Sequence, residues 1–83
     1  MTTKLNNLNL DVSCVGLREY FEIQSIQASD EKIERFLFSL GCFPTQKIKV
    51  IAHLGQNYII EVNSSRYSVD EALAQAIKLT QLP

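Results

Sequence analysis

Residues 29–51 read SDEKIERFLFSLGCFPTQKIKVI, and this stretch contains the change of pattern that decides the fold. Its apolar side chains first recur at the spacing i, i+3, i+4 and i+7, and they are Ile33, Phe36, Leu37 and Leu40. That spacing places them on one face of an α-helix, which we expect to face the core. Ser29 or Asp30 can cap the first turn, and Gly41 suits a left-handed C-terminal cap. The pattern therefore predicts a helix over Asp30–Leu40.

After this helix the sequence changes to the period of a β-strand. Pro44 cannot prolong the helix, and Lys47–Ile51 begins a regular alternation of charged and β-branched side chains. Similar patterns predict further strands at Tyr20–Gln24, Tyr58–Val62, Arg66–Tyr67 and Ile77–Leu79. His53–Asn57 is typical of a hairpin loop, and Asn63–Ser65 of a second turn. These short segments predict a mainly β domain.

A second helix is predicted at Val69–Ala76. Ser68 and Glu71 have the spacing of a capping box, in which each side chain binds the free amide of the other residue. The apolar residues that continue at helical spacing are Val69, Ala72, Leu73, Ala76 and Ile77. Short strands and two short helices do not make a parallel sheet in a chain of 83 residues. A meander of about five antiparallel strands, closed into a small barrel, is the economical arrangement because closure removes exposed strand edges.

The composition is that of one globular domain, with 46% hydrophobic and 20% charged residues. The net charge of −1 argues against a nucleic-acid-binding surface, which normally carries a basic excess. No apolar run approaches the roughly 20 residues that span a bilayer, and the Asn-rich start lacks the apolar run of a signal peptide. We therefore expect a cytoplasmic protein, with residues 1–11 as a partly ordered extension and residues 12–83 as the folded domain.

Few side chains offer catalytic or metal-binding chemistry. The candidate ligands are Cys14, Cys42, His53 and scattered carboxylates, and none of them has the short spacing of zinc ligands. Two cysteines are too few for the disulfide framework of a small secreted chain, which favours free thiols but leaves one disulfide open. No pattern indicates a paired nucleophile and base. We predict that the protein is not an enzyme and that it needs no metal or cofactor.

The order and intervals of these motifs match a pattern known from one protein family. That family has a helix ending in R-L-x-x-L-G, followed by P-G and a strand, and the matching residues here are Leu37, Leu40, Gly41, Pro44, Ile48 and Val50. The upstream family positions are occupied by Val12, Val15, Arg18, Ile23 and Ile26. The downstream positions are occupied by Tyr67, Ser68, Val69, Asp70, Ala74 and Ile77. Over residues 12–79 the chain therefore resembles the FeoA family, whose name stands for ferrous iron transport protein A.

This resemblance implies a barrel like that of Src-homology-3 (SH3) domains, which assists a FeoB-type ferrous iron transporter from the cytosolic side. Two alternatives stay open: a regulatory module related to the C-terminal domain of iron-dependent repressors, and a transition-metal-binding protein. The chain departs from the family at Arg18 and Thr45, which replace glycines, and at Phe36 and Asp70, which replace arginines. Turns that need a positive φ must therefore be reshaped or strained, and contacts of the two arginines are not carried over.

A partner-binding surface is predicted near the end of the first helix. At about 100° per residue, Phe38 lies roughly 140° from Ile33 and so points away from the core face. Phe43 follows in the loop beside Pro44, where it is either exposed or tucked into the mouth of the barrel. Two aromatic rings at one helix end would form an apolar patch of the kind that binds partners. We predict that Phe38, Phe43 and Pro44 contact a partner, with Leu40 beneath them.

Overall fold

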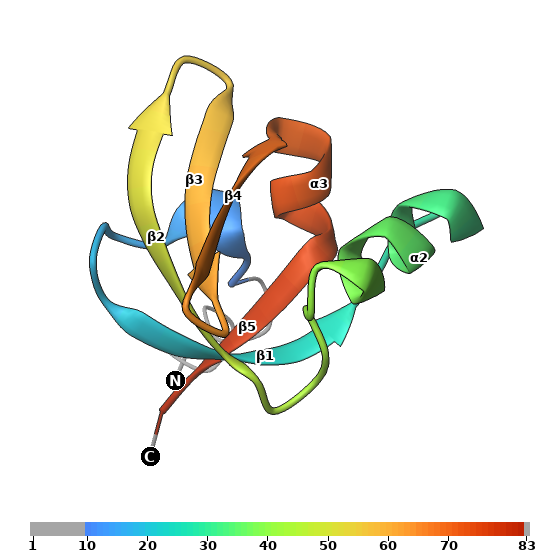
Figure 1. Ribbon diagram of the computed structural model, residues 1–83, viewed down its shortest axis with the longest axis horizontal. Coiled ribbons are helices and arrows are strands. Elements are labelled where there is room, and N and C mark those ends of the chain that lie inside the picture. Colours follow the sequence, from blue (N-terminus) through green and yellow to red (C-terminus); the bar gives the residue numbers. More distant parts are fainter. Residues whose placement is uncertain (1–9, 83) are drawn as a thin grey trace, which may run out of the picture.

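A computed structural model describes residues 10–82 as a bent antiparallel sheet with two short α-helices (Figure 1). The strands are β1 (Tyr20–Ile26), β2 (Lys47–Leu54), β3 (Asn57–Val62), β4 (Ser65–Asp70) and β5 (Ile77–Gln81). The helical segments are the 3-10 turn η1 (Val12–Cys14), α2 (Glu31–Ser39) and α3 (Glu71–Ala76). The predicted mainly β fold, with five antiparallel strands and two short helices, is confirmed.

The sheet does not close on itself within the part of the chain that the structure describes. Its strands lie in the order β4-β3-β2-β1-β5, so that β4 and β5 form the two edges. The predicted full closure of the barrel is therefore wrong. The physical reason is that α3 joins β4 directly to β5 without a loop and packs against both strands and η1. The six residues of α3 thus lie between the end of β4 and the start of β5, and these two strands do not pair with each other in the sheet.

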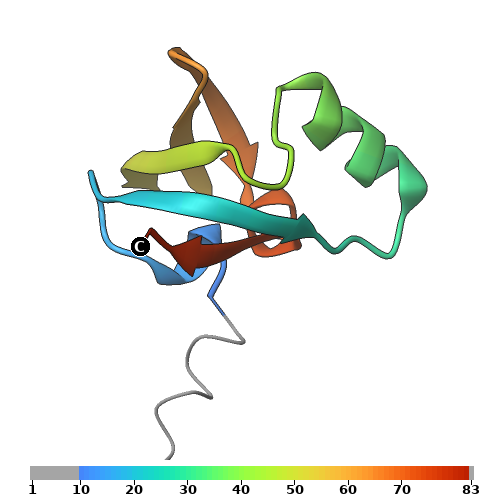
Figure 2. The same cartoon turned by 90° about the horizontal axis from the view of Figure 1, so that it is seen from below.

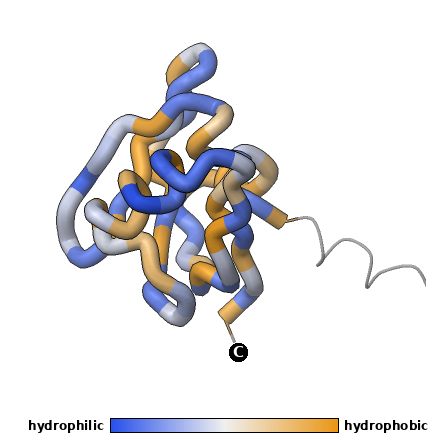
Figure 3. The backbone as a smooth tube through the Cα atoms, turned by 90° about the vertical axis from the view of Figure 1, so that its right-hand side faces the viewer, coloured by the Kyte–Doolittle hydropathy of each residue, from blue (hydrophilic) through white to orange (hydrophobic). Residues whose placement is uncertain are grey.

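The core lies inside the bend of the sheet. Along β3, for example, Tyr58, Ile60 and Val62 are buried while the residues between them are more exposed. Successive residues of a strand point to opposite faces of the sheet, which explains this alternation in burial. Figure 3 shows that hydrophobic and hydrophilic stretches follow one another along the chain. Register shifts in β1 and β2 mark bulges, which increase the local bend of a strand. The fully buried side chains include Ile23, Leu37, Ile48, Ile60, Ile77 and Leu79.

Helix α2 begins and ends where the sequence predicts. The carboxylate of Asp30 accepts a hydrogen bond from an amide of the first turn at 2.8 Å. Gly41 follows the helix with a φ of 96°. Its amide donates to the Phe38 carbonyl at 2.9 Å, and the amide of Cys42 donates to the Leu37 carbonyl at 3.1 Å. These two bonds make a Schellman motif, which satisfies carbonyls that the helix itself leaves free.

The buried face of α2 is narrower than the sequence pattern indicates. Leu37 is fully buried, and Ile33 and Leu40 pack half-buried against the core. Phe36 is 47% exposed, so its predicted position on the core face is wrong. Helix α2 lies at the side of the molecule (Figure 1 and Figure 2). A helix in that position covers its neighbours with a single stripe of side chains rather than with a broad face.

The boundary between β4 and α3 also differs from the prediction. Val69 is buried in β4, where it pairs with Tyr58, so the predicted helix starts too early. The N-cap of α3 is Asp70, whose carboxylate accepts a hydrogen bond from the Leu73 amide at 2.9 Å. The capping box that begins at Ser68 is therefore wrong. Val69 fills the core as a strand residue, and this packing overrides the local helical signal.

The hairpin between β2 and β3 is tighter than expected. Strand β2 continues to Leu54, which pairs with Asn57, so the turn itself consists of residues 55–56 rather than His53–Asn57. His53 belongs to β2 and stacks on the ring of Tyr58 in β3, with the ring centroids 4.2 Å apart. The cross-strand stacking of these two rings supports the longer hairpin.

Leu10, the first described residue, joins β5, because its carbonyl accepts a hydrogen bond from the Leu79 amide at 2.9 Å. Asp11 is buried and pairs with Lys78 across an isolated β-bridge. The rest of the predicted N-terminal extension, residues 1–9, lies outside the described residues. Among the residues that the structure describes, no helix is long and apolar enough to cross a membrane.

Candidate functional site

An aromatic surface forms where α2 ends and the chain turns toward β2. We use this name for the four residues Phe38, Leu40, Phe43 and Pro44. The rings of Phe38 and Phe43 are stacked, with centroids 5.4 Å apart and planes 16° apart. Phe43 is 46% exposed, Pro44 is exposed, and Phe38 and Leu40 are half-buried. The surface therefore presents one outward ring with a second ring behind it.

The turn after α2 determines where Phe43 lies. Gly41 has a positive φ, and a β-carbon at this position would lie 2.6 Å from Nδ2 of Asn63 in the turn between β3 and β4. The Phe43 amide donates to the Gly41 carbonyl at 3.0 Å, and the Phe43 carbonyl accepts from the Gln46 amide at 3.1 Å. Glycine adopts this backbone conformation without strain, whereas a larger residue would be strained and would also displace the Asn63 side chain. Together these contacts fix the loop that presents Phe43.

Of the four predicted site residues, the structure stacks Phe38 on Phe43, leaves Pro44 exposed beside Phe43, and packs Leu40 against the core. Phe38, which we expected to point away from the core, is half-buried because it stacks on Phe43. For Phe43 the sequence left two positions open, and the ring is exposed rather than tucked into the core. That a partner binds here remains a prediction. Sequence reasoning did not anticipate the exposed ring of Phe36, which lies about 200° around the helix from Phe38.

The structure has a polar hollow of about 360 Å³, and part of its wall is the segment that follows Pro44 in the chain. Sequence reasoning did not predict this hollow. It is lined by Tyr20, Thr45, Gln46, Lys47, Glu61, Asn63 and Ser64. Its residues come from segments far apart in the chain, so no contiguous motif marks it. The signal that was available is Thr45, which replaces a family glycine and has a φ of 77°. Asn63 and Ser64 also line the hollow with positive φ values, of 55° and 68°. The predicted strain at Thr45 is therefore confirmed, and Arg18 shows it too, with a φ of 63°.

The two cysteines are both free thiols, in different surroundings. Cys14 is exposed, and Cys42, the last residue of the Schellman motif after α2, is fully buried. Burial raises the pKa of the Cys42 thiol to about 11, because the thiolate would lose its hydration. A thiol with so high a pKa is neutral at physiological pH and is a poor nucleophile and metal ligand. Cys42 therefore acts as a small apolar side chain that packs in the hydrophobic core.

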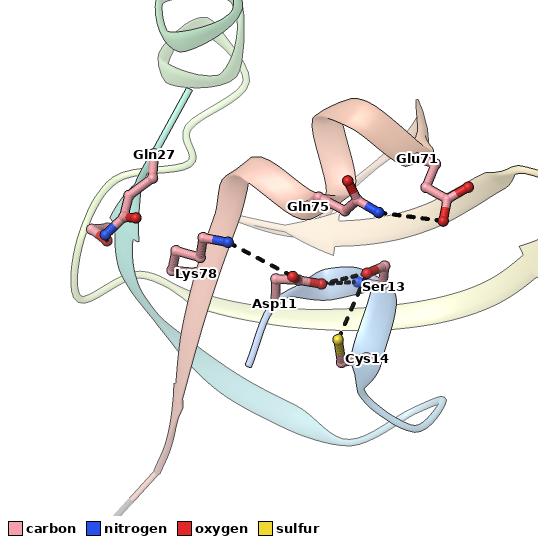
Figure 4. Close-up of polar contacts among 8 residues, drawn as sticks. Asp11, Ser13, Cys14, Gln27, Glu71, Gln75 and Lys78 are labelled. Carbon is pink, nitrogen blue, oxygen red and sulfur yellow. Dashed lines mark hydrogen bonds and ion pairs between the residues drawn. The ribbon is translucent and has the colours of Figure 1, made fainter. Parts of the chain in front are cut away.

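The polar contacts of Asp11 tie η1 to β5 (Figure 4). Its Oδ1 accepts a hydrogen bond from the Ser13 amide at 2.8 Å, and its Oδ2 lies 3.8 Å from Nζ of Lys78. The Ser13 hydroxyl lies 3.8 Å from Sγ of Cys14. Within residues 10–82, no three His, Cys, Asp or Glu side chains come close enough together to hold a metal ion. The contacts of Asp11 are those of a structural carboxylate, and the absence of a resident metal stays a prediction.

The bent sheet, its two short helices and the exposed aromatic surface define a small, mainly β domain. The sequence model of the FeoA domain matches residues 14–81. The chain therefore belongs to the FeoA domain family. No curated protein matches its sequence.

Solved structures with a similar fold are FeoA proteins and a metal-dependent repressor. An iron uptake regulatory protein (FeoA) has a TM-score of 0.78 at 22% identity, over 88% of this chain and 97% of its own. FeoA from Stenotrophomonas maltophilia, a prokaryotic SH3 domain protein complexed with zinc, has a TM-score of 0.77 at 19% identity, over 84% and 88%. A manganese-dependent transcriptional repressor has a TM-score of 0.81 at 17% identity, over 88% of this chain but 41% of the repressor. These likenesses confirm the predicted SH3-like fold.

Proposed function

We propose that this chain is a non-enzymatic, cytoplasmic accessory protein of ferrous iron transport, which docks onto the cytosolic part of a FeoB-type transporter. Membership of the FeoA domain family supports the transport role. The observation that carries the docking role is the stacked pair of Phe38 and Phe43, with Phe43 exposed beside Pro44. An exposed aromatic ring on a rigid turn binds a hydrophobic pocket with little loss of conformational entropy.

The rigidity of the surface is as important as its apolar character. The Phe43 loop is held by backbone hydrogen bonds on both sides, and its ring lies against Phe38. Leu40 packs on the core behind it. A partner that buries Phe43 would therefore not need to order the loop first. Residues of this kind, aromatic and partly buried before binding, supply most of the affinity in many interfaces.

The experiment measures, by calorimetry with purified proteins, the binding of this chain to the cytosolic domain of a FeoB-type transporter from the same organism. We expect Phe43→Ser to weaken binding by about 2 kcal/mol or more, which is the scale of a lost aromatic anchor. The matched control is Phe36→Ser, because Phe36 is equally exposed but lies on the other side of α2. This control should bind as the wild type does.

Folding and binding are separated by a denaturant melt of each variant. We expect Phe43→Ser and Phe36→Ser to change the free energy of unfolding by roughly 0.5 kcal/mol, as is usual for exposed positions. Equal losses of binding in both variants, or wild-type binding by Phe43→Ser, would contradict the assignment of the surface. No binding by the wild type would contradict the FeoB partnership itself.

A regulatory module is the second candidate, because the same fold forms part of a manganese-dependent repressor. The two candidates differ in their partners. A regulatory module would be recovered from native lysate with a DNA-binding protein, whereas an accessory transport protein would be recovered with the transporter. A pull-down with the wild type and Phe43→Ser side by side distinguishes them.

A further inference from the structure

Strand β4 is an open edge of the sheet. It pairs with β3 on one side, and within residues 10–82 no backbone hydrogen bond reaches its other side. The opposite edge, β5, is partly covered because Leu10 and Asp11 contact it. An open edge presents unpaired amides and carbonyls that can pair with another strand. The sequence of β4 decides which strand fits this edge.

The turn before β4 determines which of its backbone groups face outward. Asn63 and Ser64 both have positive φ, as in the two-residue type I′ turn. The residues beside such a turn exchange hydrogen bonds, and bonded pairs then alternate along the strands. The residues of β4 bonded to β3 are thus Ser65, Tyr67 and Val69. The amides and carbonyls of Arg66 and Ser68 point to the open edge.

The sequence of β4 is complementary to itself in one antiparallel register. A twofold axis centred on Ser68 places Arg66 opposite Asp70 of a second copy, and Tyr67 opposite Val69 of that copy. Opposite charges form a favourable cross-strand pair, and the two Arg66–Asp70 pairs favour this register. Val69 adds little to it, because that side chain is already buried in its own core. An axis centred on Arg66 or on Asp70 would instead bring two like charges face to face. An axis centred on Tyr67 or on Val69 would place Ser68 opposite a charged residue, so that no pair of opposite charges forms.

Arg66 and Asp70 can each form further hydrogen bonds in addition to those they make within their own chain. Arg66 is exposed and uses Nε for Glu61, at 3.2 Å from Oε1, which leaves its other N–H groups unused among the described residues. Asp70 uses Oδ1 for the Leu73 amide that caps α3, which leaves its Oδ2 unused in the same part of the chain. Both existing contacts can therefore persist while Arg66 and Asp70 reach across to a second copy.

We propose that β4 pairs with β4 of a second copy of this chain, so that the two sheets join into one across a twofold axis at Ser68. The occupant of the edge is a second copy rather than an unrelated strand, because the charges match in its own register. The contact is small compared with a stable protein interface, so the dimer dissociates readily on dilution. This surface is separate from the aromatic surface, and the dimer does not depend on the proposed function.

The test is a charge exchange followed by sedimentation velocity of the reduced protein over a wide range of concentration. In a dimer of Arg66→Asp, each of the two cross-strand pairs between positions 66 and 70 consists of two aspartates. In a dimer of Asp70→Arg, each of these pairs consists of two arginines. Each variant alone should therefore dimerise at least roughly tenfold more weakly than the wild type, since two favourable pairs become unfavourable. An equimolar mixture restores both pairs and should dimerise about as well as the wild type.

The matched control for Arg66→Asp is Arg35→Asp, which lowers the net charge by the same amount but lies exposed on α2. It should dimerise as the wild type does. Because Asp70→Arg also removes the cap of α3, Ser68→Pro is the second variant: its lost amide points away from β3, so the domain folds without the edge pairing. The proposal is overturned by a monomeric wild type, by a mixture no stronger than its components, or by a Ser68→Pro protein that still dimerises.

Discussion

Thr45 shows most clearly how single residues carry strain in this domain. It is a β-branched residue with a φ of 77°, in a region of backbone conformation that disfavours any side chain at Cβ. It keeps this conformation because its amide donates to the Ile23 carbonyl at 2.8 Å, which joins the loop to β1. Such strain persists only where surrounding contacts hold the backbone. The FeoA family, by the resemblance of its motif, has glycine at this position.

Replacing Thr45 with glycine should therefore stabilise the protein. Relief of the left-handed conformation contributes about 1–2 kcal/mol, and the greater freedom of glycine in the unfolded chain costs about 0.5–1 kcal/mol. We expect the free energy of unfolding to rise by roughly 0.5–1 kcal/mol in a urea melt. Thr45→Ala is the control, because alanine retains a β-carbon and should show little gain. A fall in stability on Thr45→Gly would mean that the threonine side chain is needed.

Among the elements, α2 is held to the sheet mainly by its own C-terminal end and the residues directly after it. Leu37 is its fully buried residue, and Cys42, directly after the helix, fills the core beneath it. The Cys42 amide also donates to the Leu37 carbonyl, so the same two residues join the helix end by a hydrogen bond and by packing. A change at Cys42 therefore acts on the attachment of α2 as a unit.

The thiol of Cys42 should make stability fall at alkaline pH. Its pKa is raised from 9.0 to about 11 in the folded protein, so the unfolded chain loses this proton first. The contribution is fully present below pH 9 and is lost as the pH rises toward 11, by about 1.4 kcal/mol per unit at most. Chemical melts of wild type and Cys42→Ala across this range isolate the effect by difference. Parallel pH profiles would contradict it.

Elements also show what a sequence can and cannot predict. The helix ends at Asp30 and Gly41 were predictable because one capping side chain and one glycine act locally. The start of α3 was not predictable, because residues 65–73 fit both the pattern of a strand and that of a helix cap. Burial of Val69 in the core decides for the strand. The exposure of Phe36 was missed because periodicity marks a face without saying how much of it is covered.

In the whole molecule, a continuous apolar core holds the fold together. Partly buried residues from the helices and the N-terminal segment, including Leu10, Ile33 and Leu73, pack around that core. The polar hollow is a property of the whole molecule too, because its walls come from segments that meet only in the folded chain. For that reason the pattern of neighbouring residues could not have predicted it.

The wild-type protein should melt at the same temperature with and without a strong metal chelator, under reducing conditions. The physical reason is that apolar burial, rather than coordination, accounts for its packing. A bound ion would add its binding free energy to the free energy of folding. The measurement is a pair of calorimetric scans, and a melting temperature lowered by several degrees with chelator would reveal a structural ion.

The hydrogen bond between Leu10 and Leu79 means that the first and last segments that the structure describes run side by side. A domain whose two chain ends lie close together can be inserted into a longer polypeptide without distortion of either connecting segment. The manganese-dependent repressor carries the same fold within a longer polypeptide. The adjacency of Leu10 and Leu79 gives a mechanical reason why one architecture serves both as a free-standing protein and as a module.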